Sequence, residues 1–439
     1  MFKRLPLLIA VCALAGWAGS FIVKTFLANS LITYGQGEES RTAAVGYAPN
    51  NADVLAARAR YLLYRADPPQ PEQAIRDLQA AVAASPYDYR YQLELGKAYQ
   101  GDGQMERAGE ALQQAVTLAP RYFETRWALA NHQLRTGQTD AALNEFREAL
   151  QLSGSLYDGN PRPNYNAAMN SFTAVTGALG LNLEALRRIT PPDAVSQTYL
   201  AEFLATHDAL EAALPIWRSL PANEPSSYYQ LLFQLLRELQ AKQRYDDAHE
   251  VWNKLAAVAG VATNSADNLM SDPGFERAPL SEAYPVLADS LLGFDWILRR
   301  HPEVRVRRIS GEAHQGNYAL QLSFNASMNS EFQDVSQLVA VEPGRAYKLS
   351  YFVKTQNASP LPNEAAFVEI TDAAEQTRFA LRSVVPGGTN NWQPQSLTFT
   401  TLPDTRALRI VIRNPQIRTV DLARVAEIWF DDFALEKQN

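Results

Sequence analysis

The sequence predicts an α + β chain of several domains: an N-terminal transmembrane helix, an α-solenoid of paired helices and a C-terminal β-sandwich. Three observations predict it: an apolar N-terminal run, a self-similarity with a period of 34 residues, and a change to two-residue alternation near residue 263. A chain of 439 residues is long enough for two or three domains at about 150 residues each. We place the anchor at 1–28, the helical repeats at 29–262 and the sandwich at 263–439.

The N-terminal run predicts a membrane anchor. Lys3 and Arg4 precede an uncharged apolar stretch from Leu5 to Val23, close to the roughly 20 residues that a helix needs to cross a bilayer. Positive charges before a span remain in the cytoplasm. We therefore expect a single-pass protein of a bacterial cytoplasmic membrane, with its bulk in the periplasm or outside. Two alternatives stay open: cleavage as a signal peptide within 15–20, and a lipoprotein anchored through Cys12, the single cysteine.

A spacing pattern in the sequence predicts the helical repeats. It consists of a small residue, a bulky residue four positions later and an alanine three positions after that. The pattern recurs every 34 residues, which indicates the second helix of a helix–turn–helix unit. It predicts three units, over 51–86, 89–120 and 123–152, and a diverged copy in which Trp217 recurs as Trp252. We expect Tyr99, Phe146 and both tryptophans to pack inside the repeats. The positions are Ala74, Leu78 and Ala81, then Ala108, Leu112 and Ala115, then Ala142, Phe146 and Ala149.

These positions resemble the tetratricopeptide repeat, whose glycine and tyrosine sites in the first helix match Gly96 and Tyr99. The resemblance implies a groove that takes peptide segments or partner domains, here proteins of a membrane-bound assembly. Polar residues of the first helices that should face solvent are the candidates for protein binding. They are Tyr91, Glu94 and Lys97 in one unit, and Glu124, Asn131 and Gln133 in the next.

From about residue 263 the chain alternates apolar and polar residues between proline and glycine turns. Tyr347, Leu349, Tyr351 and Val353 alternate with Lys348, Ser350 and Phe352, and the segments 318–324 and 408–413 show the same pattern. Such segments are typical of strands with one face in a core. Many of them in about 175 residues predict two packed sheets.

Four segments of this region resemble carbohydrate-binding modules of the jelly-roll type: 268–276, 341–349, 388–392 and 429–435. The resemblance implies a jelly-roll sandwich and a structural calcium ion near its chain ends. Glu276 and Asp431 are the residues that we expect at such a site, because calcium prefers carboxylate and carbonyl oxygens.

Strand parity predicts a glycan-binding face. Phe352 falls opposite the apolar face of its strand together with Lys348 and Lys354, and Arg378 and Arg382 are likewise expected to point outward. Aromatic rings stack on pyranose sugars and cations pair with acidic groups, so this face suits an acidic polysaccharide. The alternative is an ordinary solvated face. Trp296 and Trp392 are either further platforms or buried in the core and loops.

Several classes of function are disfavoured. A formal net charge of −7 argues against nucleic acid as a partner, because phosphate neutralisation needs a basic face. Short motifs for a catalytic nucleophile, a phosphate loop or a metal-binding histidine pair are missing, so we expect no enzyme, no catalytic residues and no cofactor besides calcium.

The combination of anchor, repeats and sandwich resembles membrane-anchored periplasmic proteins of bacterial exopolysaccharide systems. It implies a non-catalytic scaffold in the synthesis, assembly or export of a cell-surface polysaccharide, in which the repeats bind proteins and the sandwich contacts glycan. Two alternatives remain: a general envelope assembly protein with a purely structural sandwich, and an enzyme acting on glycans.

Overall fold

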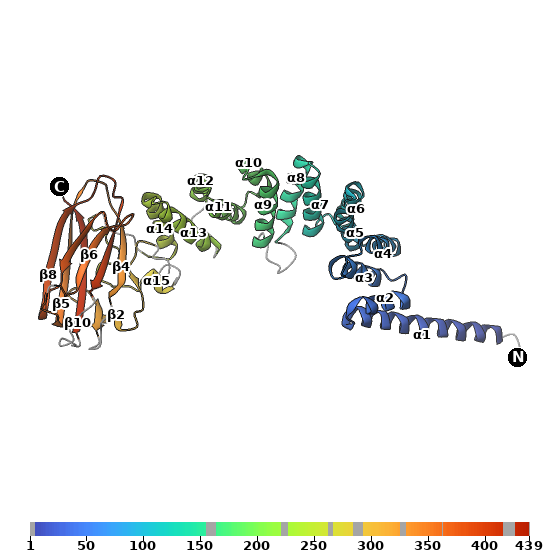
Figure 1. The fold of residues 1–439 in the computed structure, drawn as a ribbon, viewed down its shortest axis with the longest axis horizontal. Helices are drawn as coiled ribbons and strands as arrows, with labels where there is room; N and C mark the ends of the chain where they lie inside the picture. The colour runs from blue at the N-terminus through green and yellow to red at the C-terminus, as the bar shows by residue number, and fades with distance from the viewer. Residues whose placement is uncertain are drawn as a thin grey trace. The chain divides into compact units, whose positions relative to one another are not determined.

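The computed structural model describes residues 5–154, 164–220, 227–261, 267–283, 293–324, 331–361, 363–415 and 426–438. The chain forms two compact units, 1–203 and 204–439. The first consists of helices, and the second holds the last helices and a β-sandwich (Figure 1). A helical region followed by two antiparallel sheets confirms the α + β class. The border expected at 262 and 263 lies outside the described residues.

In the first unit, helices pack in sequential pairs, α3 on α4, α5 on α6 and α7 on α8. These pairs correspond to the three units that the 34-residue period predicts. The helices are α1 (Leu5–Tyr34), α2 (Gly37–Tyr47), α3 (Ala52–Tyr64), α4 (Pro71–Ala84), α5 (Tyr89–Gly101), α6 (Met105–Leu118), α7 (Phe123–Arg135), α8 (Thr139–Leu152), α9 (Tyr165–Leu179), α10 (Leu183–Ile189) and α11 (Ala194–Thr206), whose last residues belong to the second unit.

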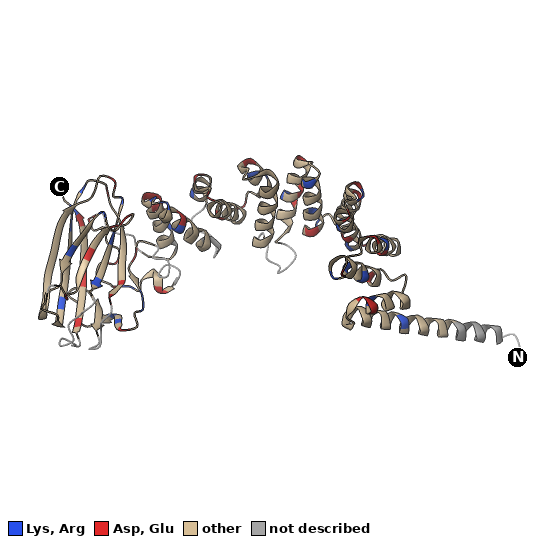
Figure 2. Cartoon of the chain, in the orientation of Figure 1, with Lys and Arg blue, Asp and Glu red and all other residues tan. Residues whose placement is uncertain are grey.

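Local chemistry explains where the repeat helices begin and end. The Asn51 side chain accepts a hydrogen bond from the backbone N–H of Val54 at 3.2 Å, and Asp88 accepts one from Arg90 at 3.0 Å, so both cap helix N-termini. Gly103 and Gly137 both adopt a φ of +78° in the turns within the second and third pairs. Glycine adopts this left-handed conformation without strain. Figure 2 shows acidic and basic residues interspersed along the helices, as on solvated faces.

The helix α1 contains the apolar run Leu5–Val23 in which the sequence predicts a membrane span. Within the part of the chain that the structure describes, no helix meets the length and apolarity needed for crossing a membrane. The side chains of 1–13, which include the start of the predicted span, lie outside that part. The helix α1 ends at Tyr34, and α2 begins at Gly37.

The residues that repeat with the period form the core of the helical region. Ala74, Leu78 and Ala81 are fully buried, as are their counterparts in the next two pairs. Tyr99, Phe146, Trp217 and Trp252 are buried too, which confirms their predicted role in packing. Gly96 lies against the neighbouring helix, where a Cβ atom would approach Leu112 Cγ to 2.6 Å. The repeat therefore requires the smallest residue at this position.

We expect Gly96→Ala to destabilise the helical unit by about 1–3 kcal/mol, because the added methyl group overpacks the contact with Leu112. The matched control is Gly101→Ala in the same helix, where a Cβ meets no atom within 4 Å. That change should be neutral or stabilise by about 0.5–1 kcal/mol, since alanine loses less backbone entropy in a helix. Thermal unfolding followed by circular dichroism at 222 nm compares the two, and equal effects would contradict the close α5–α6 contact.

The second unit contains the remaining helices and a sandwich of two five-stranded antiparallel sheets, which confirms the predicted sandwich. One sheet has the strand order β1-β4-β9-β6-β7 and the other β2-β3-β10-β5-β8. The elements are α12 (Leu210–Ser219), α13 (Ser227–Ala241), α14 (Tyr245–Val258), α15 (Leu280–Ala283), β1 (Ile297–Leu298), β2 (Val304–Ser310), β3 (Tyr318–Phe324), β4 (Phe332–Ala340), β5 (Ala346–Ala358), β6 (Phe367–Asp372), β7 (Ala380–Val384), β8 (Gly388–Thr400), β9 (Ala407–Asn414) and β10 (Ala426–Lys437).

The two sheets enclose one apolar core. Strand β5 follows the predicted parity: Tyr347, Leu349, Tyr351 and Val353 belong to the core, and Phe352 does not. Strands β3, β9 and β10 contribute their alternate residues to the same cluster. The other side chains of β5 therefore lie on the outer face of its sheet, which positions the site considered next.

Candidate functional site

The six polar residues predicted for protein binding lie on α5 and α7. Lys97 is exposed, and Glu94 is half-buried and accepts a hydrogen bond from Arg60 Nη1 of the preceding pair at 3.0 Å. Tyr91 departs from the prediction. Only 4% of it is exposed, and its hydroxyl donates to Asp53 Oδ1 at 2.7 Å, so this ring belongs to the packing between neighbouring helices.

On α7, Glu124, Asn131 and Gln133 are all half-buried. The Asn131 amide donates to the carbonyl oxygen of Trp127 in its own helix at 2.7 Å, which reduces its availability to a partner. Among the six predicted residues, Lys97 is the most open to solvent.

A pocket of about 270 Å³ in the first unit was missed by the sequence analysis. Its walls include Tyr61, Tyr64 and three cationic side chains, those of Arg41, Arg60 and Arg65. The Arg41 guanidinium lies 4.9 Å from the centre of the Tyr61 ring. Because α1, α2 and α3 all contribute, no single repeat pattern contains the pocket.

On the sandwich, Phe352 lies on the outer face of the β2-β3-β10-β5-β8 sheet and is half-buried. The His314 ring stacks on it with centroids 3.7 Å apart and planes inclined by 15°. The Trp392 ring of β8 meets the same histidine edge-on at 5.8 Å. One face of Phe352 is therefore occupied, and the aromatic surface is a cluster of three rings instead of one open platform.

The cations expected beside Phe352 do not share one face. Lys348 and Lys354 lie on β5, but Arg382 lies on β7 of the opposite sheet, and Arg378 lies in the turn before β7. The outer faces of two packed sheets point away from each other, so the predicted single basic face is wrong. Arg382 pairs with Glu369 at 3.0 Å, Arg378 with Asp404 at 2.5 Å, and Lys354 with Glu312 at 2.5 Å.

Trp296 does not lie on the surface. Its exposure is 0%, its ring packs against Phe275 and Phe433, and its Nε1–H donates to the carbonyl oxygen of Asp272 at 3.1 Å. The prediction of Trp296 as a sugar platform is therefore wrong, and its alternative role in the core is confirmed.

The two carboxylates considered for calcium both lie next to Gly274 and are therefore close to each other. A Cβ atom built at Gly274 would lie 3.3 Å from Asp431 Oδ1 and 3.6 Å from Glu276 Cγ. Both accept backbone hydrogen bonds from the loop before β3. Asp431 Oδ2 accepts from His314 at 2.7 Å, and Glu276 Oε1 accepts from Asn317 at 2.8 Å. We call this arrangement, Glu276 and Asp431 with the N–H groups of His314, Gln315, Asn317 and Tyr318, the carboxylate clasp.

The clasp fits calcium poorly. Calcium takes about six to eight oxygen ligands, whereas two carboxylates converge here and oxygens of both already accept backbone hydrogen bonds. In the described ranges no group of three His, Cys, Asp or Glu side chains is placed to hold a metal. The clasp holds the loop that carries His314, and thereby positions that ring on Phe352.

Burial raises the pKa of Asp431 to about 6, although the N–H groups of His314, Asp432 and Gln315 lower it. The folded chain therefore holds this proton more tightly than the unfolded chain, in which an aspartate titrates near pH 4. Asp431 contributes stability that is present below about pH 4 and is lost as the pH rises through about 6.

The asparagine side chain of Asp431→Asn does not titrate, so we expect this variant to remove the loss of stability. Relative to the variant, the unfolding free energy of the native chain should fall between about pH 4 and 6 and stay constant above. Denaturant unfolding at a series of pH values, in EDTA, measures it. If millimolar calcium abolished the change in the native chain, the carboxylate would be a calcium ligand and the clasp would have been misread.

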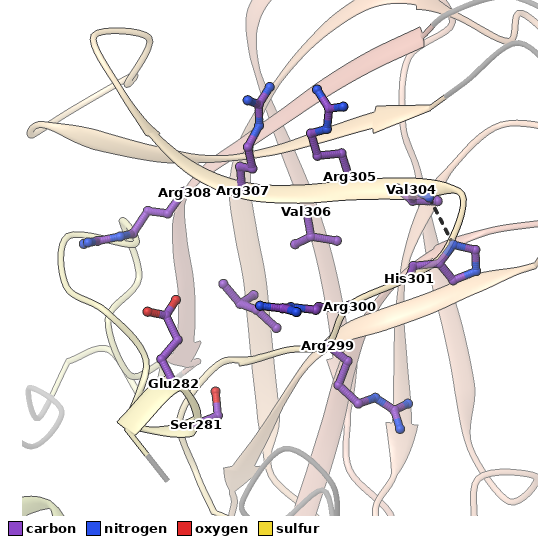
Figure 3. A pocket seen from close by; sticks show the side chains of 11 residues that line it. Ser281, Glu282, Arg299, Arg300, His301, Val304, Arg305, Val306, Arg307 and Arg308 are labelled. Atoms are coloured by element: carbon purple, nitrogen blue, oxygen red, sulfur yellow. Dashed lines mark hydrogen bonds between the residues drawn. The ribbon is translucent and has the colours of Figure 1, made fainter. Parts of the chain in front are cut away.

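A basic segment was also overlooked in the sequence. Residues 299–308 carry Arg299, Arg300, Arg305, Arg307 and Arg308, together with His301. They line a pocket of about 1120 Å³ whose acidic lining residue is Glu282 (Figure 3). Figure 3 shows Arg305 and Arg307 extending side by side from β2, on the side away from Val306.

Residues 89–122, which cover the α5–α6 pair, match the tetratricopeptide repeat. The chain therefore contains repeats of this type, which form surfaces for binding other proteins. No match to a curated protein was found.

Solved structures resemble parts of the chain. They include a MamA protein (18% identity, 47% of this chain and all of that chain, TM-score 0.31) and PilF of Pseudomonas aeruginosa (16%, 49% and 97%, TM-score 0.31). A family 16 carbohydrate-binding module also resembles part of it (18% identity, 30% of this chain and 84% of that chain, TM-score 0.22). All three TM-scores are far below 0.5.

Proposed function

We propose that the chain is a non-catalytic scaffold whose helical repeats bind another protein. The observation that carries the proposal is the set of tetratricopeptide-type helix pairs, in which the first helices present polar side chains such as Glu94 and Lys97. Solenoids of this type use such surfaces as extended docking sites.

Photo-crosslinking in intact cells tests this function. A photoreactive residue at Lys97, which is exposed on α5, should crosslink to a discrete protein partner. The matched control is Gln114, exposed on α6, the second helix of the same pair. Equal crosslinking from both positions, or adducts with the chain itself alone, would contradict a partner bound by the first helices.

We further propose that the apolar run Leu5–Val23 anchors the chain in the bacterial cytoplasmic membrane, with the remainder in the periplasm or outside. The charge pattern of the N-terminus supports this topology. A reporter enzyme that is active only in the periplasm, fused after Asn439, should be active. A well-expressed but inactive fusion would overturn it.

The third part of the proposal is that the sandwich contacts a cell-surface polysaccharide. Its support is the ring cluster of Phe352, His314 and Trp392 on an outer sheet face, since aromatic rings stack on the apolar faces of sugars. The role is in the assembly or export of the polysaccharide and includes no catalysis. Hydrolysis of any member of a glycan panel by the purified chain would contradict the non-catalytic assignment.

We expect Phe352→Ala to weaken glycan binding by about 1 kcal/mol or more with little loss of stability, because the ring lies outside the core. Leu349→Ala on the same strand is the control: this side chain is fully buried, and its truncation should cost about 2–5 kcal/mol of stability. A glycan array and thermal unfolding of the full chain in mild detergent provide both readouts. Absence of binding to every glycan would favour a general envelope protein with a structural sandwich.

A further inference from the structure

The arginines of the basic segment are not equally engaged. Arg299 pairs with Asp334 at 3.4 Å, and Arg308 lies 4.3 Å from the centre of the Tyr318 ring. Arg300 and Arg305 are exposed, and neither has a carboxylate within salt-bridge distance among the residues that the structure describes. Within the described ranges, the pocket therefore has cationic groups without a carboxylate partner.

Strand register connects two of these arginines to the rest of the sheet. On β2, Val304 and Val306 face the core, so Arg305 and Arg307 lie on the outer face. Arg307 is opposite Gln321 of β3, Gln321 is opposite Trp429 of β10, and Trp429 is opposite Lys354 of β5.

Side-chain contacts follow the same line. The Arg307 guanidinium donates to Gln321 Oε1 at 3.2 Å, and Lys354 Nζ lies 5.0 Å from the centre of the Trp429 ring. We call the line of Arg307, Gln321, Trp429 and Lys354 the polar row. It crosses four neighbouring strands. Gln321 is 7% and Trp429 4% exposed, so the members with accessible surface are Arg307 and Lys354 at its two ends.

The arrangement places two like charges next to each other, which a bound anion would neutralise. Arg305 and Arg307 extend from the same side of one strand (Figure 3), and their like charges repel each other. An arginine forms two parallel hydrogen bonds with a carboxylate, which satisfies its planar fork. The chain has a net charge of −7, so its overall field does not attract anions. Any attraction of an anion to this face comes from Arg305 and Arg307 themselves.

We propose that the glycan bound by the sandwich is an acidic polysaccharide with carboxylate groups on its sugars, and that it lies across the outer face of this sheet with carboxylates on Arg305 and Arg307. The proposal rests on the proposed glycan-binding function and specifies its ligand class. Arg305 and Arg307 are both exposed, and regularly spaced carboxylates suit such separate guanidinium groups better than the continuous charge of a lipid surface does.

The experiment compares an oligogalacturonate with its fully methyl-esterified form, in which every carboxylate is converted to a neutral ester, each titrated against the full chain in mild detergent. The native chain should bind the charged form about tenfold more tightly, as expected for charge-assisted hydrogen bonds. The double variant Arg305→Gln/Arg307→Gln should lose this preference and keep its thermal unfolding temperature. Arg378→Gln, which removes an exposed arginine in the turn before β7 of the other sheet, is the control and should retain the preference.

The outcomes separate the two proposals. Equal affinity for both ligands would overturn the acidic ligand class and leave glycan binding intact. Binding of neither ligand, nor of any glycan on an array, would overturn both. Arginine-dependent binding to single-stranded DNA or to phosphatidylglycerol vesicles that exceeds binding to the oligogalacturonate would also overturn the acidic glycan.

Discussion

Trp296→Ala should lower the unfolding free energy of the sandwich by about 3–5 kcal/mol, the largest effect that we expect for one truncation. The indole is fully buried, packs against Phe275 and Phe433, and donates its N–H to the carbonyl oxygen of Asp272. Truncation leaves a cavity between these rings and also an unpaired carbonyl oxygen. Denaturant unfolding followed by tryptophan fluorescence measures the change.

Trp392→Ala is the matched control, because Trp392 lies half-buried on the outer face instead of in the core. It should cost clearly less, within about 1 kcal/mol. Comparable losses from the two variants would mean that the assignment of inner and outer positions in this sandwich is wrong.

Arg277→Leu should cost about 3–5 kcal/mol, since it leaves a buried carboxylate without its counter-charge. Arg277 Nη1 lies 2.8 Å from Asp295 Oδ2, and its Nη2 lies 2.9 Å from Asp295 Oδ1. Asp295 is 3% exposed and also accepts a hydrogen bond from the backbone N–H of Leu280 at 2.9 Å. The pair therefore fastens the segment before α15 to the segment that precedes β1.

A double-mutant cycle with Asp295→Asn tests this explanation. Removing the carboxylate charge should recover part of the loss in the Arg277→Leu background, because the remaining amide is cheaper to bury than an unpaired charge. Strictly additive effects of the two substitutions would show that the ion pair is not the origin of the cost.

The sequence was informative where the structure is local. A 34-residue period places Ala74, Leu78 and Ala81 in the helical core because each repeat packs in the same way on its neighbours, and all three are buried. Parity along one strand likewise predicted that Leu349 points inward and Phe352 outward. Both patterns indicate which side chains of one helix or one strand are buried, and that depends little on the rest of the fold.

The site required information that the patterns do not hold. Parity assigns Arg382 to an outer face but does not identify its sheet. The strand order shows that Arg382 and Lys354 belong to different sheets, whose outer faces point away from each other. His314 comes from a loop without periodicity, and two carboxylates distant in sequence hold that loop in place. Tyr91 has a polar atom that suggested exposure, but its hydroxyl finds a partner in the neighbouring repeat.

The strand order has a consequence for synthesis of the chain. The last strand, β10, lies in the middle of its sheet between β3 and β5, and Asn268 at the start of the sandwich bonds to the backbone of Leu435, 167 residues later. The helical repeats differ, because their contacts join helices that are neighbours in sequence. They can fold while the chain is still emerging from the ribosome. The sandwich can close only after its final strand has been released, so a nascent chain stalled before residue 426 should carry folded repeats and an open, protease-sensitive β region.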